Sequence, residues 1–278
     1  MRYLTLILLL CTTPLHAQDR VEVDVELFLA ADVSRSMQPF ELEIQRRGYA
    51  AALASPEVMN ALSGGMLGRI ALTYVEWAGA GSQRVIVPWT MIQTQGDADR
   101  VARQITSSFD DGLRRTSISS ALDFAAASIA ENQYDGLRRV IDISGDGPNN
   151  SGPPVTEARD RALAQGITIN GLPLMTHGSD SFARWSIPDL DAYYTACVIG
   201  GTGAFVLPVT DWAGFEDAVR RKLVLEIAML PESQPEMVPK TIPETQPERI
   251  YRAQARAPYN CLVGEQIWER NRDIFALP

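Results

Sequence analysis

Short apolar runs alternate with helix-like segments from about residue 21 to residue 228, and this alternation limits the possible folds more than any other feature. Within the helix-like segments, apolar residues recur every three or four positions, as they do over residues 118–129. Strands separated by helices of this length form parallel sheets through right-handed crossovers. The sequence therefore predicts a doubly wound, mostly parallel α/β sheet with helices on both faces. The strand-like runs are residues 25–31, 70–77, 85–89, 140–144, 167–174 and 204–209.

Two glycines mark the place where neighbouring strands are expected to run antiparallel. Gly79 and Gly81 lie between the second and third strand-like runs, a spacing that is typical of a β-hairpin. We therefore expect an antiparallel edge strand around Val85. Helices are further expected over residues 40–53, 97–109, 155–165 and 190–198, and along a last helix lined by Trp212, Phe215, Val219 and Leu223.

The N-terminal residues 1–17 are typical of a secretory signal peptide. Arg2 precedes a short apolar run, and Ala17 supplies the small residue of a cleavage site. A frayed N-terminal strand is the alternative interpretation. The apolar run is shorter than the roughly 20 residues that span a bilayer. We therefore expect a periplasmic or secreted protein with no transmembrane segment in its mature chain.

The composition changes after residue 228. Prolines recur every fourth residue from Pro231 to Pro247, with polar and acidic residues between them. This pattern favours an extended linker over residues 231–248. The expected layout is thus a signal peptide, a folded domain over residues 18–230, the linker, and a C-terminal segment over residues 249–278.

The chain without its expected signal peptide keeps two cysteines, Cys197 and Cys261. In an oxidising compartment they are disulfide candidates, and such a bond would tie the C-terminal segment to the domain. Two unpaired, buried thiols are the alternative.

Oxygen-bearing side chains follow the predicted strands at three places. Asp32, Ser34 and Ser36 end the first strand, Thr116 precedes a helix, and Asp146 follows a later strand. Ligands on doubly wound sheets bind at the carboxyl ends of the strands. Carboxylate and hydroxyl oxygens are hard donors that suit Mg²⁺, with Mn²⁺ or Ca²⁺ as further possibilities. The sequence thus indicates a divalent-cation site at this edge.

Each of these residues also has a purely structural interpretation. Ser34, Ser36 and Thr116 could cap the helices that follow them, and Asp146 could form a turn beside glycine. Three polar neighbours, Asp142, Asn149 and Asn150, are not expected to be ligands. Asp142 is interpreted as a hydrogen-bonded structural carboxylate, and the two asparagines as loop residues.

The three segments together resemble a von Willebrand factor A domain over residues 21–228. The resemblance implies a metal-ion-dependent adhesion site formed by Asp32, Ser34, Ser36, Thr116 and Asp146. Residues 144–150 and 197–205 look more like a secreted bacterial branch of that superfamily, whose function is uncharacterised. The sequence departs from the family pattern in two loops. Arg114 and Arg115 precede the threonine where a glycine is usual, and Gly145 replaces the threonine of Thr-Asp-Gly.

The expected function is recognition of a protein partner. Neutral hydroxyls donate little charge to the cation, which stays electrophilic if the two carboxylates reach it mainly through water. It can then bind an aspartate or glutamate carboxylate presented by that partner. The formal net charge of −9 argues against a nucleic-acid partner.

An enzyme is the main alternative. A metal- or serine-dependent hydrolase could use the same strand ends, with His177 as the base. No Gly-x-Ser-x-Gly elbow surrounds Ser34 or Ser36, so we expect a binding module and not an enzyme. A structural envelope protein that has lost its metal is a third possibility.

Overall fold

A mixed, mostly parallel sheet forms the centre of the molecule. The computed structural model describes residues 20–107, 113–176, 186–228, 251–252 and 259–272. The strands lie in the order β3-β2-β1-β4-β5-β6-β7. The inner strands run parallel, whereas β3 and β7 pair antiparallel at the two edges. Their bounds are β1 (Val21–Asp32), β2 (Ile70–Trp77), β3 (Gln83–Ile92), β4 (Tyr134–Gly145), β5 (Ile167–Pro173), β6 (Phe205–Val206) and β7 (Tyr251–Arg252).

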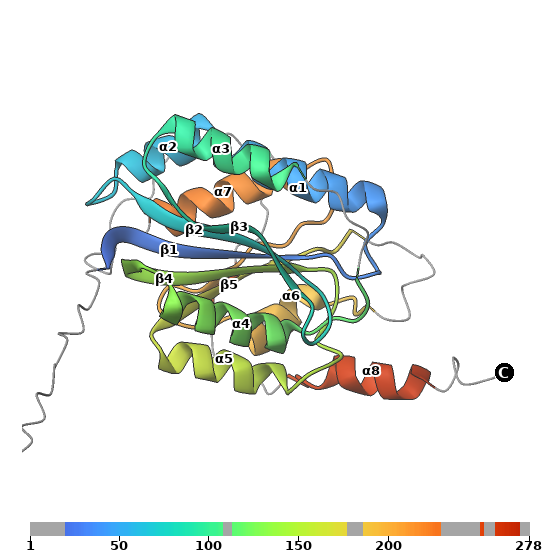
Figure 1. The fold of residues 1–278 in the computed structure, drawn as a ribbon. Helices are drawn as coiled ribbons and strands as arrows, with labels where there is room; N and C mark the ends of the chain where they lie inside the picture. Colours follow the sequence, from blue (N-terminus) through green and yellow to red (C-terminus); the bar gives the residue numbers. More distant parts are fainter. Residues whose placement is uncertain (1–19, 108–112, 177–185, 229–250, 253–258, 273–278) are drawn as a thin grey trace, which may run out of the picture.

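Helices cover both faces of this sheet, as Figure 1 shows. One layer contains α1 (Pro39–Leu53), α2 (Pro56–Ser63), α3 (Gln95–Ile105) and α7 (Phe215–Ala228). The opposite layer contains α4 (Ile118–Glu131), α5 (Val155–Ala164) and α6 (Leu190–Tyr193), and a π-helical turn, η1 (Tyr194–Val198), continues α6. The last helix, α8 (Val263–Arg272), lies at the end of the molecule where β1 and β4 finish. The predicted doubly wound architecture and the antiparallel strand around Val85 are confirmed.

Alternation along β1 produces two cores. Leu27 and Leu29 pack into the core beneath α1 and α7, whereas Phe28 and Ala30 pack into the core beneath α4 and α5. Successive side chains of a strand point to opposite faces, so an uninterrupted apolar run is buried on both sides. This central position places the end of β1 beside the ends of both β2 and β4.

Two predicted elements differ from the observed ones. The strand expected over residues 204–209 is a two-residue strand, β6, although Leu207 and Val209 still donate their N–H groups to the carbonyls of Gly171 and Pro173 in β5. The helix expected over residues 190–198 changes into a π-helical turn at Tyr194. This turn contains Cys197, which forms a disulfide bond with Cys261, so the two candidate cysteines are paired.

Several predictions concern residues outside those described. The signal peptide, the Pro-rich linker and His177 all lie in segments whose structure is not described. Among the described residues, no helix combines the length and apolar character needed to cross a bilayer.

A buried ionic cluster joins α7 to the sheet. The Nζ of Lys222 lies 2.7 Å from Oδ1 of Asp142 and also contacts Glu226, and all three side chains are at most 1% exposed. Asn170 donates a hydrogen bond to Glu226 over 2.9 Å. Asp142 is therefore the structural carboxylate that its position within a strand predicts.

Candidate metal centre

The first loop of the candidate site is a tight turn at the end of β1. The backbone N–H of Ser34 donates to Oδ1 of Asp32 over 2.7 Å, which fixes the carboxylate against its own loop. The hydroxyl oxygens of Ser34 and Ser36 lie 2.9 Å apart. Aspartate commonly accepts from the backbone two residues ahead in this way. The turn gathers the three predicted side chains of this loop.

The loop after β4 approaches the first loop directly. Strands β1 and β4 are parallel neighbours, with Ala31 paired to Ser144, so both chains end at the same edge. The hydroxyl of Ser36 donates to Oδ1 of Asp146 over 2.9 Å. Four of the five predicted ligands thus form one group that is connected by hydrogen bonds.

Thr116 lies in a loop that is bonded to both of the others. The N–H of Leu113 donates to the carbonyl of Val33 over 2.7 Å, which joins this loop to the first one. Thr116 donates its N–H to Oδ1 of Asn150 over 3.0 Å and accepts from the N–H of Asn150 over 2.9 Å. The structure therefore places Thr116, 5% exposed, where the three loops meet.

Burial makes this group electrostatically unusual. Asp32 is fully buried and Asp146 is 4% exposed. Burial, and then the negative charge of Asp146, hold the pKa of Asp32 well above its ordinary value. The second carboxylate oxygen of Asp32, Oδ2, is buried and has no hydrogen-bond partner among the described residues. A cation would relieve both costs, because it adds positive charge and coordinates the free oxygen.

The donor set therefore fits a hard divalent ion. In the described part of the chain, no group of three or more His, Cys, Asp or Glu side chains is placed to hold a metal ion. A site here depends on hydroxyl oxygens beside its carboxylates, which suits Mg²⁺, Mn²⁺ or Ca²⁺ better than a thiolate-seeking metal.

The helix-capping interpretations of the hydroxyls are wrong. Helix α1 begins after Gln38, whose N–H donates to Oε2 of Glu41 over 2.7 Å, and neither Ser34 nor Ser36 caps it. The cap of α4 is Ser117, which accepts from the N–H of Ser120 over 3.3 Å, and not Thr116. The three hydroxyls are therefore free of the structural task that local sequence would give them.

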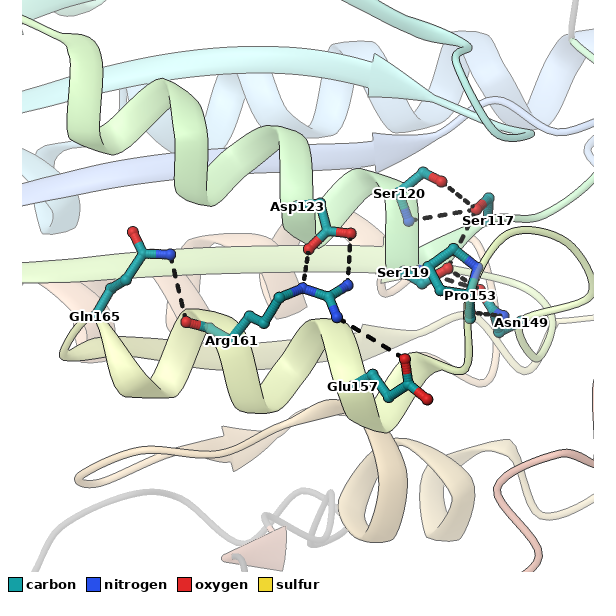
Figure 2. Close-up of polar contacts among 9 residues, drawn as sticks. All are labelled: Ser117, Ser119, Ser120, Asp123, Asn149, Pro153, Glu157, Arg161 and Gln165. Carbon is teal, nitrogen blue, oxygen red and sulfur yellow. Dashed lines mark hydrogen bonds and ion pairs between the residues drawn. The ribbon is translucent and has the colours of Figure 1, made fainter.

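The asparagines after Asp146 do more than complete a loop. Asn149 is fully buried, and its Oδ1 accepts from the N–H of Ser119 over 3.1 Å, at the start of α4 (Figure 2). Its Nδ2 donates to the carbonyl of Pro153 over 3.2 Å. With Asn150 bonded to Thr116, these amides hold two ligand-bearing loops together, a role that sequence analysis missed. No local sequence pattern predicts this role, because the hydrogen-bond partners are about 30 residues away in the chain.

Two further buried side chains, Tyr194 and Trp77, pack beside Gly145 and Asp32. The hydroxyl of Tyr194 and the indole Nε1 of Trp77 are buried without hydrogen-bond partners among the described residues. A Cβ placed on Gly145 would lie 2.8 Å from the Tyr194 hydroxyl, 3.0 Å from Oδ2 of Asp32 and 3.2 Å from the Trp77 ring. This crowding explains why a glycine stands where the family pattern has threonine.

Replacing Gly145 with alanine is expected to lower the free energy of unfolding by about 1–3 kcal/mol, because the new methyl group overpacks this space. In a Tyr194→Phe background the loss should shrink, since the hydroxyl nearest to the methyl group is gone. Chemical denaturation of the four proteins measures the coupling. Gly147→Ala is the control, because its Cβ would meet nothing within 4 Å. Equal losses in both backgrounds would exclude the clash with Tyr194.

Comparison with known proteins identifies a family for this chain. A family model described as "Protein of unknown function (DUF1194)" matches residues 22–231. No curated protein matches the chain. Solved structures do, and one of them is "von Willebrand factor type A from Catenulispora acidiphila", which is 18% identical over 74% of this chain and 43% of its own, with a TM-score of 0.50. This chain therefore has a von Willebrand factor A-like fold.

Proximal thread matrix protein 1 from the mussel byssus is 16% identical with a TM-score of 0.54, and it covers 75% of this chain. A second structure of that protein, described as having a zinc-occupied MIDAS motif, gives 17% identity and a TM-score of 0.52. The pilus adhesin SpaC from Lactobacillus rhamnosus GG is 11% identical over 75% of this chain, with a TM-score of 0.55. The present chain spans 49% of the mussel protein and 31% of the adhesin, so the likeness concerns the fold.

Proposed function

The chain belongs to the family described as "Protein of unknown function (DUF1194)", and we propose that it is a periplasmic or secreted protein-binding module that works through a bound divalent cation. One observation carries the proposal. The buried carboxylate of Asp32 keeps an unpartnered oxygen beside the carboxylate of Asp146, and serine hydroxyls connect the two. A stable domain has little reason to bury two neighbouring carboxylates unless a cation joins them.

The five side chains would divide the work of holding the cation. The two carboxylates of Asp32 and Asp146 supply the negative charge, and Ser34, Ser36 and Thr116 supply neutral oxygens. When bound, the cation supplies a positive centre that attracts a carboxylate from outside. The loops around it hold its ligands at the edge of the sheet, where a partner can approach. The partner we propose is a protein that presents an aspartate or glutamate.

The choice of ion rests on the chemistry of the donors. Oxygen atoms alone favour Mg²⁺, and Mn²⁺ and Ca²⁺ accept the same ligands. The zinc-occupied MIDAS motif of the mussel protein supports a divalent cation on this fold without selecting magnesium. Secretion, the domain boundaries at residues 17, 230 and 248, and a non-enzymatic role are part of the same proposal.

The purified protein is expected to melt at a higher temperature with Mg²⁺ or Mn²⁺ than with a chelator, because binding stabilises only the folded state. A free ion concentration of about 100 times the dissociation constant adds about 2.7 kcal/mol. Asp32→Asn should abolish this response. In the absence of metal, the Asp32→Asn variant should be at least as stable as the wild type, since the substitution removes a buried charge next to Asp146.

The control for that experiment is Asp123→Asn, which changes a half-exposed carboxylate on α4 that pairs with Arg161 (Figure 2). It should keep the full metal response. If no ion raises the melting temperature of the wild type, or if Asp32→Asn responds as the wild type does, the proposed cation site is wrong. If metal raises the melting temperature of the wild type, its binding to acidic protein partners should disappear when a chelator is added.

A further inference from the structure

Helix α8 contacts a ligand-bearing loop although it lies beyond the residues that the family model matches. Oε1 of Glu265 accepts from Nδ2 of Asn149 over 2.7 Å. Gly264 packs so closely on this loop that a Cβ there would lie 2.0 Å from the carbonyl oxygen of Asn149. Asn149 follows Asp146 by three residues, so α8 packs against the loop that carries this predicted ligand.

The same helix also contacts the threonine loop. The guanidinium of Arg115, directly before Thr116, lies 3.5 Å from the centre of the Trp268 ring. A guanidinium over an indole face is an attractive cation–π arrangement. Trp268 follows Glu265 by three residues, and residues so spaced lie on one side of a helix. One face of α8 therefore contacts two of the three loops that form the site.

The backbone of Arg115 adopts a left-handed conformation. Its φ of 75° is the only positive value outside glycine among the described residues. This left-handed conformation is unfavourable for any residue with a Cβ. Arg115 adopts this conformation while its guanidinium lies over the ring of Trp268. Arg115 therefore presents its guanidinium to α8 from a backbone conformation that favours glycine.

Two connections hold α8 in this position. Cys261, two residues before the helix, is bonded to Cys197 in the π-helical turn. The hydroxyl of Tyr259 donates to Asp189 over 2.8 Å, just before α6. Tyr194 belongs to the same turn as Cys197, and its hydroxyl lies beside Gly145. The disulfide therefore joins α8 to the same π-helical turn whose Tyr194 packs beside Gly145 and Asp32.

We propose that α8 is a clamp on the metal centre, in which Trp268 and Glu265 are positioning residues that hold the Thr116 and Asp146 loops at the spacing required for the cation. This inference rests on the proposed function. It adds that the C-terminal segment is part of the site, because removing its contacts releases the loops while every ligand stays in the chain.

The test is Mn²⁺ affinity, measured by calorimetry on the full chain. Trp268→Ala is expected to weaken Mn²⁺ binding at least tenfold, and Trp268→Phe, which keeps an aromatic face for Arg115, should lose less than threefold. Arg270→Ala, an exposed change on the same helix, should stay within twofold of the wild type. Arg115→Gly should also weaken Mn²⁺ binding, although glycine adopts this backbone conformation more easily. In the Trp268→Ala background it should cause no further loss of affinity.

Amide hydrogen exchange without metal provides the second readout. Trp268→Ala should accelerate exchange at Asn150, whose N–H bonds Thr116, but not at central amides of β1. If the wild type binds Mn²⁺ and Trp268→Ala binds it equally well, the clamp is wrong and the proposed function stands. If the wild type binds no ion, the proposed function fails. Exchange then decides: faster exchange at Asn150 supports a loop clamp, and unchanged exchange overturns it.

Discussion

Lys222→Met is expected to lower the free energy of unfolding at pH 7–8 by about 3–5 kcal/mol, the usual cost of leaving buried charges without their partner. Lys222 is fully buried between Asp142 and Glu226, and both acids are also buried. Methionine fills a similar volume but leaves two carboxylates facing each other in a medium that hydrates neither. Denaturant titration of the two proteins measures the loss.

The pH dependence identifies the cause of that loss. Burial raises the pKa of Glu226 to about 7 from an ordinary value of 4.5, and burial also raises the pKa of Asp142. An acid whose pKa is higher in the folded state stabilises the fold below its unfolded pKa, and this stability is lost as the pH rises through the folded value. Without Lys222 both pKa values should rise further. The variant should therefore lose more stability at pH 8 than at pH 5.

The matched control is Arg161→Met. Arg161 pairs with Asp123 over 2.8 Å, but the two side chains are 49% and 40% exposed (Figure 2). Water screens such a pair, so the variant should lose less than about 1 kcal/mol with little dependence on pH. A similar small loss for Lys222→Met, or a loss that does not change between pH 5 and pH 8, would contradict the role of the buried cluster.

Removal of the Cys197–Cys261 disulfide has the second large expected effect. The bond joins residues 64 positions apart, and such a loop restricts the unfolded chain considerably. The chain-entropy model gives about 4 kcal/mol for this length, and typical measured values are about 2–4 kcal/mol. The double variant Cys197→Ala/Cys261→Ala should lose stability within that range, as measured by denaturant titration.

Reduction of the wild type is the control for the substitution itself, because it opens the bond and keeps both sulfur atoms. The reduced protein and the double variant should lose similar amounts. Hydrogen exchange should show α8 losing protection while the central strands β1 and β4 keep theirs, since Cys261 lies next to that helix. A loss below about 1 kcal/mol in both proteins would mean that the bond contributes little to the fold.

Much of the fold was predictable because its signals are local. Residues 27–31 of β1 are apolar on both faces, which already indicates a central parallel strand. The predicted ligands also followed from a general rule, since parallel strands bring their carboxyl ends to one edge. The rule predicted the meeting of Ser36 and Asp146, which are 110 residues apart in the chain.

The surroundings of the ligands could not be predicted in this way. Asn150 resembles any loop asparagine, and only the folded chain pairs it with Thr116. The crowding at Gly145 depends on Tyr194. This residue lies in a π-helical turn, where the sequence pattern predicted an ordinary helix. These partners are chosen by packing between distant segments, and no short window of sequence records that packing.

By itself, the sequence determined the layered α/β fold, the edge of the sheet where the site lies, and the five side chains proposed as ligands, because hydrophobic period and strand direction are properties of each segment alone. Only the tertiary structure decided that Lys222 neutralises Asp142, that Cys197 pairs with Cys261, and that α8 returns to the site through Trp268 and Glu265. Such contacts depend on how closely segments far apart in the chain approach one another, and that distance exists only after the sheet and both helical layers have assembled.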